Sequence, residues 1–288
     1  MEKEIKLNKA SGTNAERTSG KFITSLSYAC FTFALVVLFH QGLLAFLSIK
    51  LGYETHISFL RVTSKPFDNM YWSNNRVLLL YAFPPGLLIL SAGVFISRMF
   101  LYSVKKIDKW FVLSFWWSVN CLLYVSTQMT IALIAYSFGR DDLYQGIPVV
   151  INWFDVSMGM TFLFSLFTVI GNLLLGFLFY QLVMQFSPTR ASVLSPTKQF
   201  ATIRSYFLYP LILMVPLGAF LSFPNRPFFF LFFLVNGLLW LPGLFIKVRM
   251  GFGGEARIER NEIRNLKPAG IAAIIIFIIL VRIIFVVV

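Results

Sequence analysis

The residues best suited to chemistry in this chain are His40 and Gln41, which lie side by side in a long apolar stretch. Residues 22–49 contain no Lys, Arg, Asp or Glu, and His40 is their only histidine. The stretch is long enough to cross a hydrocarbon core of ~30 Å as a helix. An imidazole beside an amide in such a helix is either a functional site or a polar contact with a neighbouring helix.

The sequence around His40 resembles the first helix of site-2-type intramembrane zinc metalloproteases. That helix carries His-Glu-x-x-His, and this chain has Leu38-Phe39-His40-Gln41-Gly42-Leu43-Leu44-Ala45-Phe46. Zinc hydrolysis needs two histidines one helical turn apart and a glutamate that activates the zinc-bound water. Here His40 matches the first histidine, whereas Gln41 stands at the glutamate position and Leu44 at the position of the second histidine.

The same family has a later helix that supplies an aspartate ligand, and Asn152-Trp153-Phe154-Asp155 with Gly159 resembles it. With one histidine and no glutamate, the resemblance implies a catalytically inactive relative that binds membrane substrates or partners. We therefore expect no catalytic residue, no metal ion and no cofactor.

Amide side chains elsewhere in the apolar stretches offer a second candidate site. Asn120, Gln128, Asn172 and Asn236 could line a polar path for an ion or small solute, or could hydrogen-bond between helices. No acidic residue lies firmly within a stretch, which argues against a proton- or sodium-coupled carrier. The candidate polar intramembrane site comprises His40, Gln41, Asn152, Asp155, Asn172 and Asn236.

The composition indicates a membrane protein. Hydrophobic residues make up 58% of the sequence and charged residues 13%, whereas soluble domains carry about 25% charge. The 33 phenylalanines suit lipid-facing surfaces and interfacial belts. The net charge of +13 lies in short loops beside apolar stretches, which indicates membrane topology and anionic lipid headgroups rather than nucleic acid. Cys30 and Cys121 form no CxxC motif.

The predicted fold is an all-α, polytopic transmembrane helical bundle with about seven spans. The predicted spans are residues 22–49, 77–97, 110–138, 157–186, 205–223, 228–246 and 270–288. Residues 1–21 are predicted to form a disordered basic tail, and residues 22–288 a single transmembrane domain. Pro84 and Pro85 should kink or break the second span, because paired prolines remove two backbone donors.

Two segments outside the predicted spans also carry signals of where they lie relative to the membrane. Residues 50–76 include Tyr71 and Trp72, which indicates an interfacial segment on the membrane surface. Residues 146–154 are too short to cross a bilayer, so they are re-entrant, interfacial or the beginning of the fourth span.

The basic residues predict the orientation of the chain. With seven spans, 18 Lys and Arg residues fall on the side of the N-terminus and 6 on the other, which favours a cytoplasmic N-terminus and an external C-terminus. The short loops favour a bacterial cytoplasmic (inner) membrane.

The leading functional hypothesis is a non-enzymatic integral membrane subunit or scaffold whose partners are lipid and other membrane proteins. It follows from the absence of recognisable catalytic motifs and of a soluble domain. The alternatives are a catalytically inactive site-2-protease-like protein and a small-solute transporter or channel.

Overall fold

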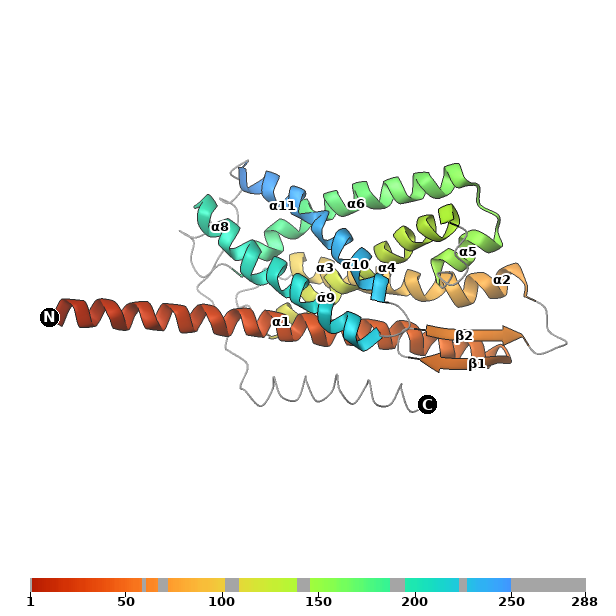
Figure 1. Ribbon diagram of the computed structural model, residues 1–288, viewed down its shortest axis with the longest axis horizontal. Coiled ribbons are helices and arrows are strands. Elements are labelled where there is room, and N and C mark those ends of the chain that lie inside the picture. The colour runs from red at the N-terminus through yellow and green to blue at the C-terminus, as the bar shows by residue number, and fades with distance from the viewer. Residues whose placement is uncertain are drawn as a thin grey trace.

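The computed structural model describes residues 2–58, 61–66, 72–101, 109–138, 146–186, 195–222 and 227–249, and the fold is a bundle of helices (Figure 1). The predicted seventh span, residues 270–288, lies outside these described residues, as does the segment 251–269. The elements are α1 (Glu2–Lys50), β1 (Tyr53–Ser58), β2 (Arg61–Pro66), α2 (Asn74–Val77), η1 (Leu78–Ala82), α3 (Phe83–Leu101), α4 (Lys109–Phe138), α5 (Ile147–Trp153), α6 (Met158–Met184), α8 (Pro196–Ile203), η3 (Arg204–Leu208), α9 (Tyr209–Ser222), α10 (Pro227–Leu238) and α11 (Trp240–Arg249).

Five helical segments are long and apolar enough to cross a membrane, so the protein is an all-α bundle of the integral membrane class. They are Phe22–Lys50, Asn74–Leu101, Trp110–Ile134, Met158–Met184 and Phe229–Arg249. These segments coincide with the first, second, third, fourth and sixth predicted spans. The fifth predicted span, residues 205–223, is helical as η3 and α9.

Helix α1 begins at Glu2, well before the predicted first span. The structure therefore continues the helix through residues that the sequence analysis assigned to a disordered tail. Lys, Glu and Ala are good helix formers, and adding residues to an existing helix costs far less than starting one.

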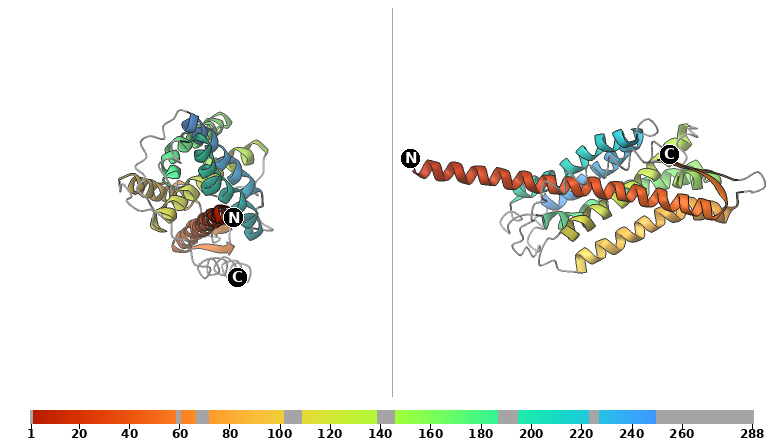
Figure 2. Two further views of the ribbon diagram at one scale, coloured as in Figure 1. Left: turned by 90° about the vertical axis from the view of Figure 1, so that its left-hand side faces the viewer. Right: turned by 90° about the horizontal axis from the view of Figure 1, so that it is seen from below.

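Successive long helices run in opposite directions, which sorts their ends into two groups (Figure 1). The ends of α3, α6 and α11 and the starts of α4 and α8 lie at one end of the bundle, which we call the basic end. The β-hairpin, α2, α5 and the start of α6 lie at the other, the hairpin end. Helix α4 is central, since it contacts α1, α3, α5, α6 and α10 (Figure 2).

The prolines of the second span do not break it. Asn74–Leu101 is one continuous helix in which the π-helical turn η1 ends at Ala82, two residues before Pro84. A proline cannot donate to the carbonyl four residues earlier and collides with it, and the wider π turn accommodates the pair.

Part of residues 50–76, for which the sequence predicts an interfacial segment, forms a two-stranded antiparallel hairpin. Tyr53 pairs with Pro66 and Ser58 with Arg61, so alternate residues share a face. Tyr53 and Val62 are buried against Leu44, Leu80 and Tyr81 at the ends of α1 and η1, whereas Glu54 and His56 are exposed. The hairpin is thus amphipathic with a period of two residues, and it covers this end of the bundle.

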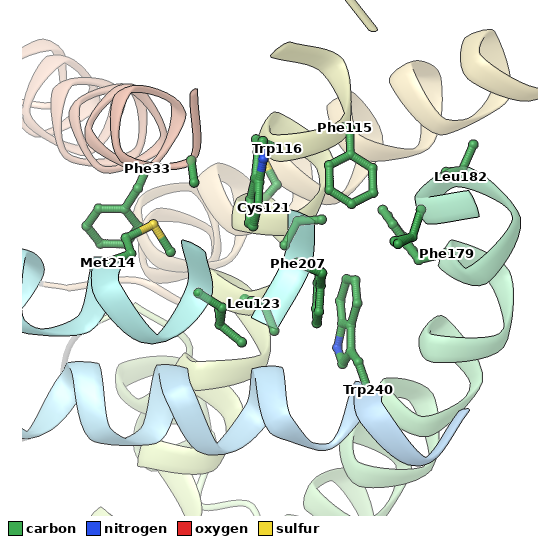
Figure 3. Close-up of a cluster of buried hydrophobic side chains, with 14 of the residues drawn as sticks. Phe33, Phe115, Trp116, Cys121, Leu123, Phe179, Leu182, Phe207, Met214 and Trp240 are labelled. Atoms are coloured by element: carbon green, nitrogen blue, oxygen red, sulfur yellow. The ribbon is translucent and has the colours of Figure 1, made fainter. Parts of the chain in front are cut away.

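Aromatic side chains fill the core around α4 (Figure 3). Trp116 of α4 stacks on Phe207 of η3 with ring centroids 6.2 Å apart, and Phe207 stacks on Trp240 of α11 at 5.8 Å. Phe33 and Phe115 are also fully buried. The phenylalanines therefore build the interior as well as the lipid-facing surface to which the sequence analysis assigned them.

Candidate functional site: polar clusters around α4

His40 and Gln41 lie inside the bundle, 1% and 2% exposed, and both face α4. His40 Nδ1 lies 3.3 Å from Tyr124 Oη, and Gln41 Nε2 donates a 3.3 Å hydrogen bond to the same phenol oxygen. His40 Nε2 lies 3.4 Å from Gln128 Nε2. Tyr124 and Gln128 are four residues apart, so both project from one face of α4. We call these four residues the histidine cluster.

The hydrogen bonds of Gln128 indicate the protonation of His40. The Gln128 Oε1 atom accepts from the backbone N–H of Ile147 at 3.3 Å, which turns the amide nitrogen toward His40. His40 Nε2 is then an acceptor, and the single proton of the neutral imidazole sits on Nδ1 and points at Tyr124. Both ring nitrogens of His40 therefore lie beside polar groups of α4.

The same glutamine fixes the start of α5. Gly146 has φ +67°, a conformation that favours glycine, and a Cβ at this position would overlap Gln128 Oε1. Trp153 Nε1 at the other end of α5 donates to Asn74 Oδ1 at 2.9 Å. Helix α5 is therefore a separate short helix at the hairpin end, and residues 154–157 divide it from α6.

Asn172 and Asn236 meet in a second cluster on another side of α4. Asn172 Nδ2 donates to Asn236 Oδ1 at 2.9 Å, and Asn236 Nδ2 donates to Thr130 Oγ1 at 3.1 Å. Asn172 Oδ1 accepts from Ser126 Oγ at 3.2 Å and from Trp240 Nε1 at 2.9 Å. This asparagine cluster joins α4, α6, α10 and α11, and both asparagines are buried.

A third group of polar contacts ties α1 to α4 and η3. Asn120 Nδ2 donates to the Ala29 carbonyl at 2.9 Å, and Trp116 Nε1 donates to Ser25 Oγ at 2.9 Å. Ser25 Oγ in turn donates to the Tyr206 carbonyl at 3.0 Å. That carbonyl lies four residues before Pro210, which has no N–H to give it, so Ser25 supplies the donor that the helix lacks.

Asn152 and Asp155 lie apart from both clusters. They are exposed at the end of α5, and the Asp155 N–H donates to the Asn152 carbonyl at 3.1 Å in a turn where Asp155 has φ +47°. The six predicted site residues thus fall into three places: His40 with Gln41, Asn172 with Asn236, and Asn152 with Asp155.

Sequence reasoning missed several members of these clusters. Tyr124, Ser126, Thr130 and Trp240 were not predicted site residues. Gln128 was predicted as one of four amides that line a polar path or bond between helices, and not as a partner of His40. The spacing of Asn120, Tyr124 and Gln128 by four residues was the available signal, because it places them on one helix face. The donors and acceptors are all neutral groups and largely satisfy one another. Within the described residues, no group of three or more His, Cys, Asp or Glu side chains could hold a metal ion.

The first half of α6 is exposed on nearly all sides. In residues 158–170 only Thr161 is buried, and Phe162, Leu163 and Phe164 are all exposed although successive side chains point about 100° apart. The second half is packed closely against α11: a Cβ added at Gly176 would overlap the Trp240 carbonyl oxygen, and one at Gly243 the Leu173 carbonyl oxygen.

Comparison with protein-family models, curated proteins and solved structures finds no match to this chain. The resemblance to site-2-type metalloproteases therefore stays a prediction from the residues around His40, Asn152 and Asp155.

Proposed function

We propose that the protein is a non-enzymatic integral membrane subunit or scaffold that binds another membrane protein through the first half of α6. The observation that carries the proposal is the contrast between this helix and the others. In the most apolar stretch of α6, 17% of the residues are buried, against 61% in α4 and 39% in the segment that contains α3.

Lipid alone accounts well for a helix exposed on one side. Helix α3 is of this kind, because Leu88, Ala92 and Met99 are buried while Leu90 and Val94 face outward. Residues 158–170 have no such buried side apart from Thr161. Since helices in membranes gain their position from close packing, a helix of another protein would supply the contacts that this half of α6 lacks.

Photo-crosslinking in the native membrane tests the proposal. A benzophenone amino acid is placed at Phe167 of α6 and, as a matched control, at Leu90 of α3, because both side chains are 66% exposed. We expect a specific protein adduct from position 167 and only lipid adducts from position 90. Lipid adducts from both positions would remove the support for the scaffold.

The two alternatives have less support in the contacts. An inactive protease-like protein would be favoured by a polar cavity shared by His40 and Asp155, but His40 is buried against Tyr124 and Gln128 while Asp155 is exposed. A solute path would be favoured by water-accessible asparagines, but Asn172 and Asn236 are 1% and 2% exposed.

For the topology we propose seven spans with the N-terminus and the basic end in the cytoplasm, in a bacterial inner membrane. The alternating helices support this orientation, because the end of α3, the start of α8 and the end of α11 lie at the same end of the bundle (Figure 1). These segments and η3, which follows α8, carry Arg98, Lys198, Arg204, Lys247 and Arg249. In intact cells, a membrane-impermeant maleimide should label N75C at the hairpin end but not T197C at the basic end. Labelling of T197C alone would reverse the orientation.

A further inference from the structure

A cationic surface lies where α8 and η3 meet α11 at the basic end. The two helical segments touch through Phe200 and Phe245, whose ring centroids are 5.2 Å apart. The cations of this surface are Lys198, Arg204, Lys247 and Arg249, which we call the basic corner.

The basic corner has no acidic neighbour within its own elements. The segments from Pro196 to Leu208 and from Pro227 to Arg249 contain no Asp or Glu. Lys198, Arg204 and Arg249 are exposed, and Lys247 is half-buried. Residues 250–269, which follow Arg249 outside the described residues, carry four Lys or Arg and three Glu, so they add no net negative charge.

Apolar surface adjoins these cations. Phe200 is 37% exposed and Ile246 39% exposed. Arg204 lies over the ring of Tyr209, with its Cζ atom 5.7 Å from the centroid, because the π turn η3 brings residues five apart into line. The surface therefore combines phosphate-binding donors with an apolar neighbourhood, as the headgroup and upper acyl chains of a lipid require.

We infer that the basic corner binds the headgroup phosphate of an anionic phospholipid. Lysine and arginine beside a membrane attract anionic lipids, and α8, η3, α10 and α11 contribute no carboxylate that would repel them. The inference is independent of the protein partner proposed for α6, because it concerns the other end of the bundle and different residues.

The test compares the association of spin-labelled phosphatidylglycerol and phosphatidylcholine with the full chain in nanodiscs. The variant K198Q/R249Q removes two cations of the basic corner, and K50Q/R76Q removes one lysine and one arginine at the hairpin end as the matched control. We expect the preference for phosphatidylglycerol to fall about fivefold for each cation removed from the corner. The control should keep the preference of the original protein.

If both variants lose the same share of the preference for phosphatidylglycerol, the preference depends on general surface charge, and the inference is overturned. Displacement of the lipid by millimolar inorganic phosphate would also overturn it, by assigning the corner to free phosphate. If K198Q/R249Q does not fold, a photoactivatable phosphatidylglycerol is bound to the unchanged protein and its adducts are mapped. Adducts in residues 196–204 and 240–249 support the site, and adducts confined to other regions exclude it.

Discussion

Asn172 donates a 2.9 Å hydrogen bond to Asn236, joining α6 to α10 beside the central helix α4. Each amide is buried and has further partners on other helices, so the pair belongs to a network that joins four helices. In hydrocarbon such groups cannot exchange protein partners for water. They therefore fix which helices pack together.

Replacing Asn172 by Ala should destabilise the bundle by about 1–3 kcal/mol, because Trp240 Nε1 and Asn236 would each lose a buried partner. The free energy of unfolding is measured by denaturation in mixed micelles. The control is T168A on the same helix, since Thr168 Oγ1 donates to the Phe164 carbonyl within α6. Equal costs for N172A and T168A would mean that the network contributes nothing.

The spans were predictable because bilayer thickness and backbone hydrogen bonding leave an apolar segment few possible conformations in a membrane. Residues 77–97 were predicted where Asn74–Leu101 lies, and residues 157–186 where Met158–Met184 lies. An apolar run of this length that lacks charge can satisfy its backbone in lipid only as a helix.

The hairpin and the clusters were not predictable in the same way. The alternation around Tyr53 is short and lies among charged residues, and its buried face becomes evident only against Leu44 and Leu80. The pairing of Asn172 with Asn236 depends on how three helices rotate about their axes. Hydropathy does not fix that rotation, because lipid and protein interior are equally apolar.

Gly176→Ala should destabilise the contact between α6 and α11, since the added methyl group would overlap the Trp240 carbonyl oxygen. Overpacking of this kind costs about 1–3 kcal/mol. G171A on the same helix is the matched control, because a Cβ at Gly171 meets nothing within 4 Å. It should be neutral or stabilise by up to about 1 kcal/mol through higher helix propensity. Denaturation in mixed micelles compares the two, and a destabilised G171A with an unaffected G176A would contradict the packing.

Ser25→Ala should be costly because the hydroxyl group serves two partners, Trp116 Nε1 and the Tyr206 carbonyl. We expect a loss of about 1–3 kcal/mol in unfolding free energy. S27A is the control, since Ser27 Oγ donates to the Ile23 carbonyl within α1.

The cost of S25A should shrink when Pro210 is also replaced by alanine, because an alanine at that position has an N–H to offer the Tyr206 carbonyl. A double-mutant cycle over S25A and P210A measures this coupling. A coupling of zero would mean that Ser25 does not replace the missing helical donor.

His40 should act as a packing residue that binds no zinc. A ligand held at about 100 times its Kd adds about 2.7 kcal/mol to stability, so a zinc site would raise the Tm visibly when metal is added and lower it with a chelator. We expect neither shift, because Tyr124 and Gln128 engage both ring nitrogens.

H40L and Q128L should each lower stability and be coupled in a double-mutant cycle by about 0.6–1.7 kcal/mol, the range measured for polar contacts between membrane helices. A rise in Tm with zinc that is absent in H40L would instead show that the imidazole is a metal ligand and would favour the metalloprotease-like interpretation.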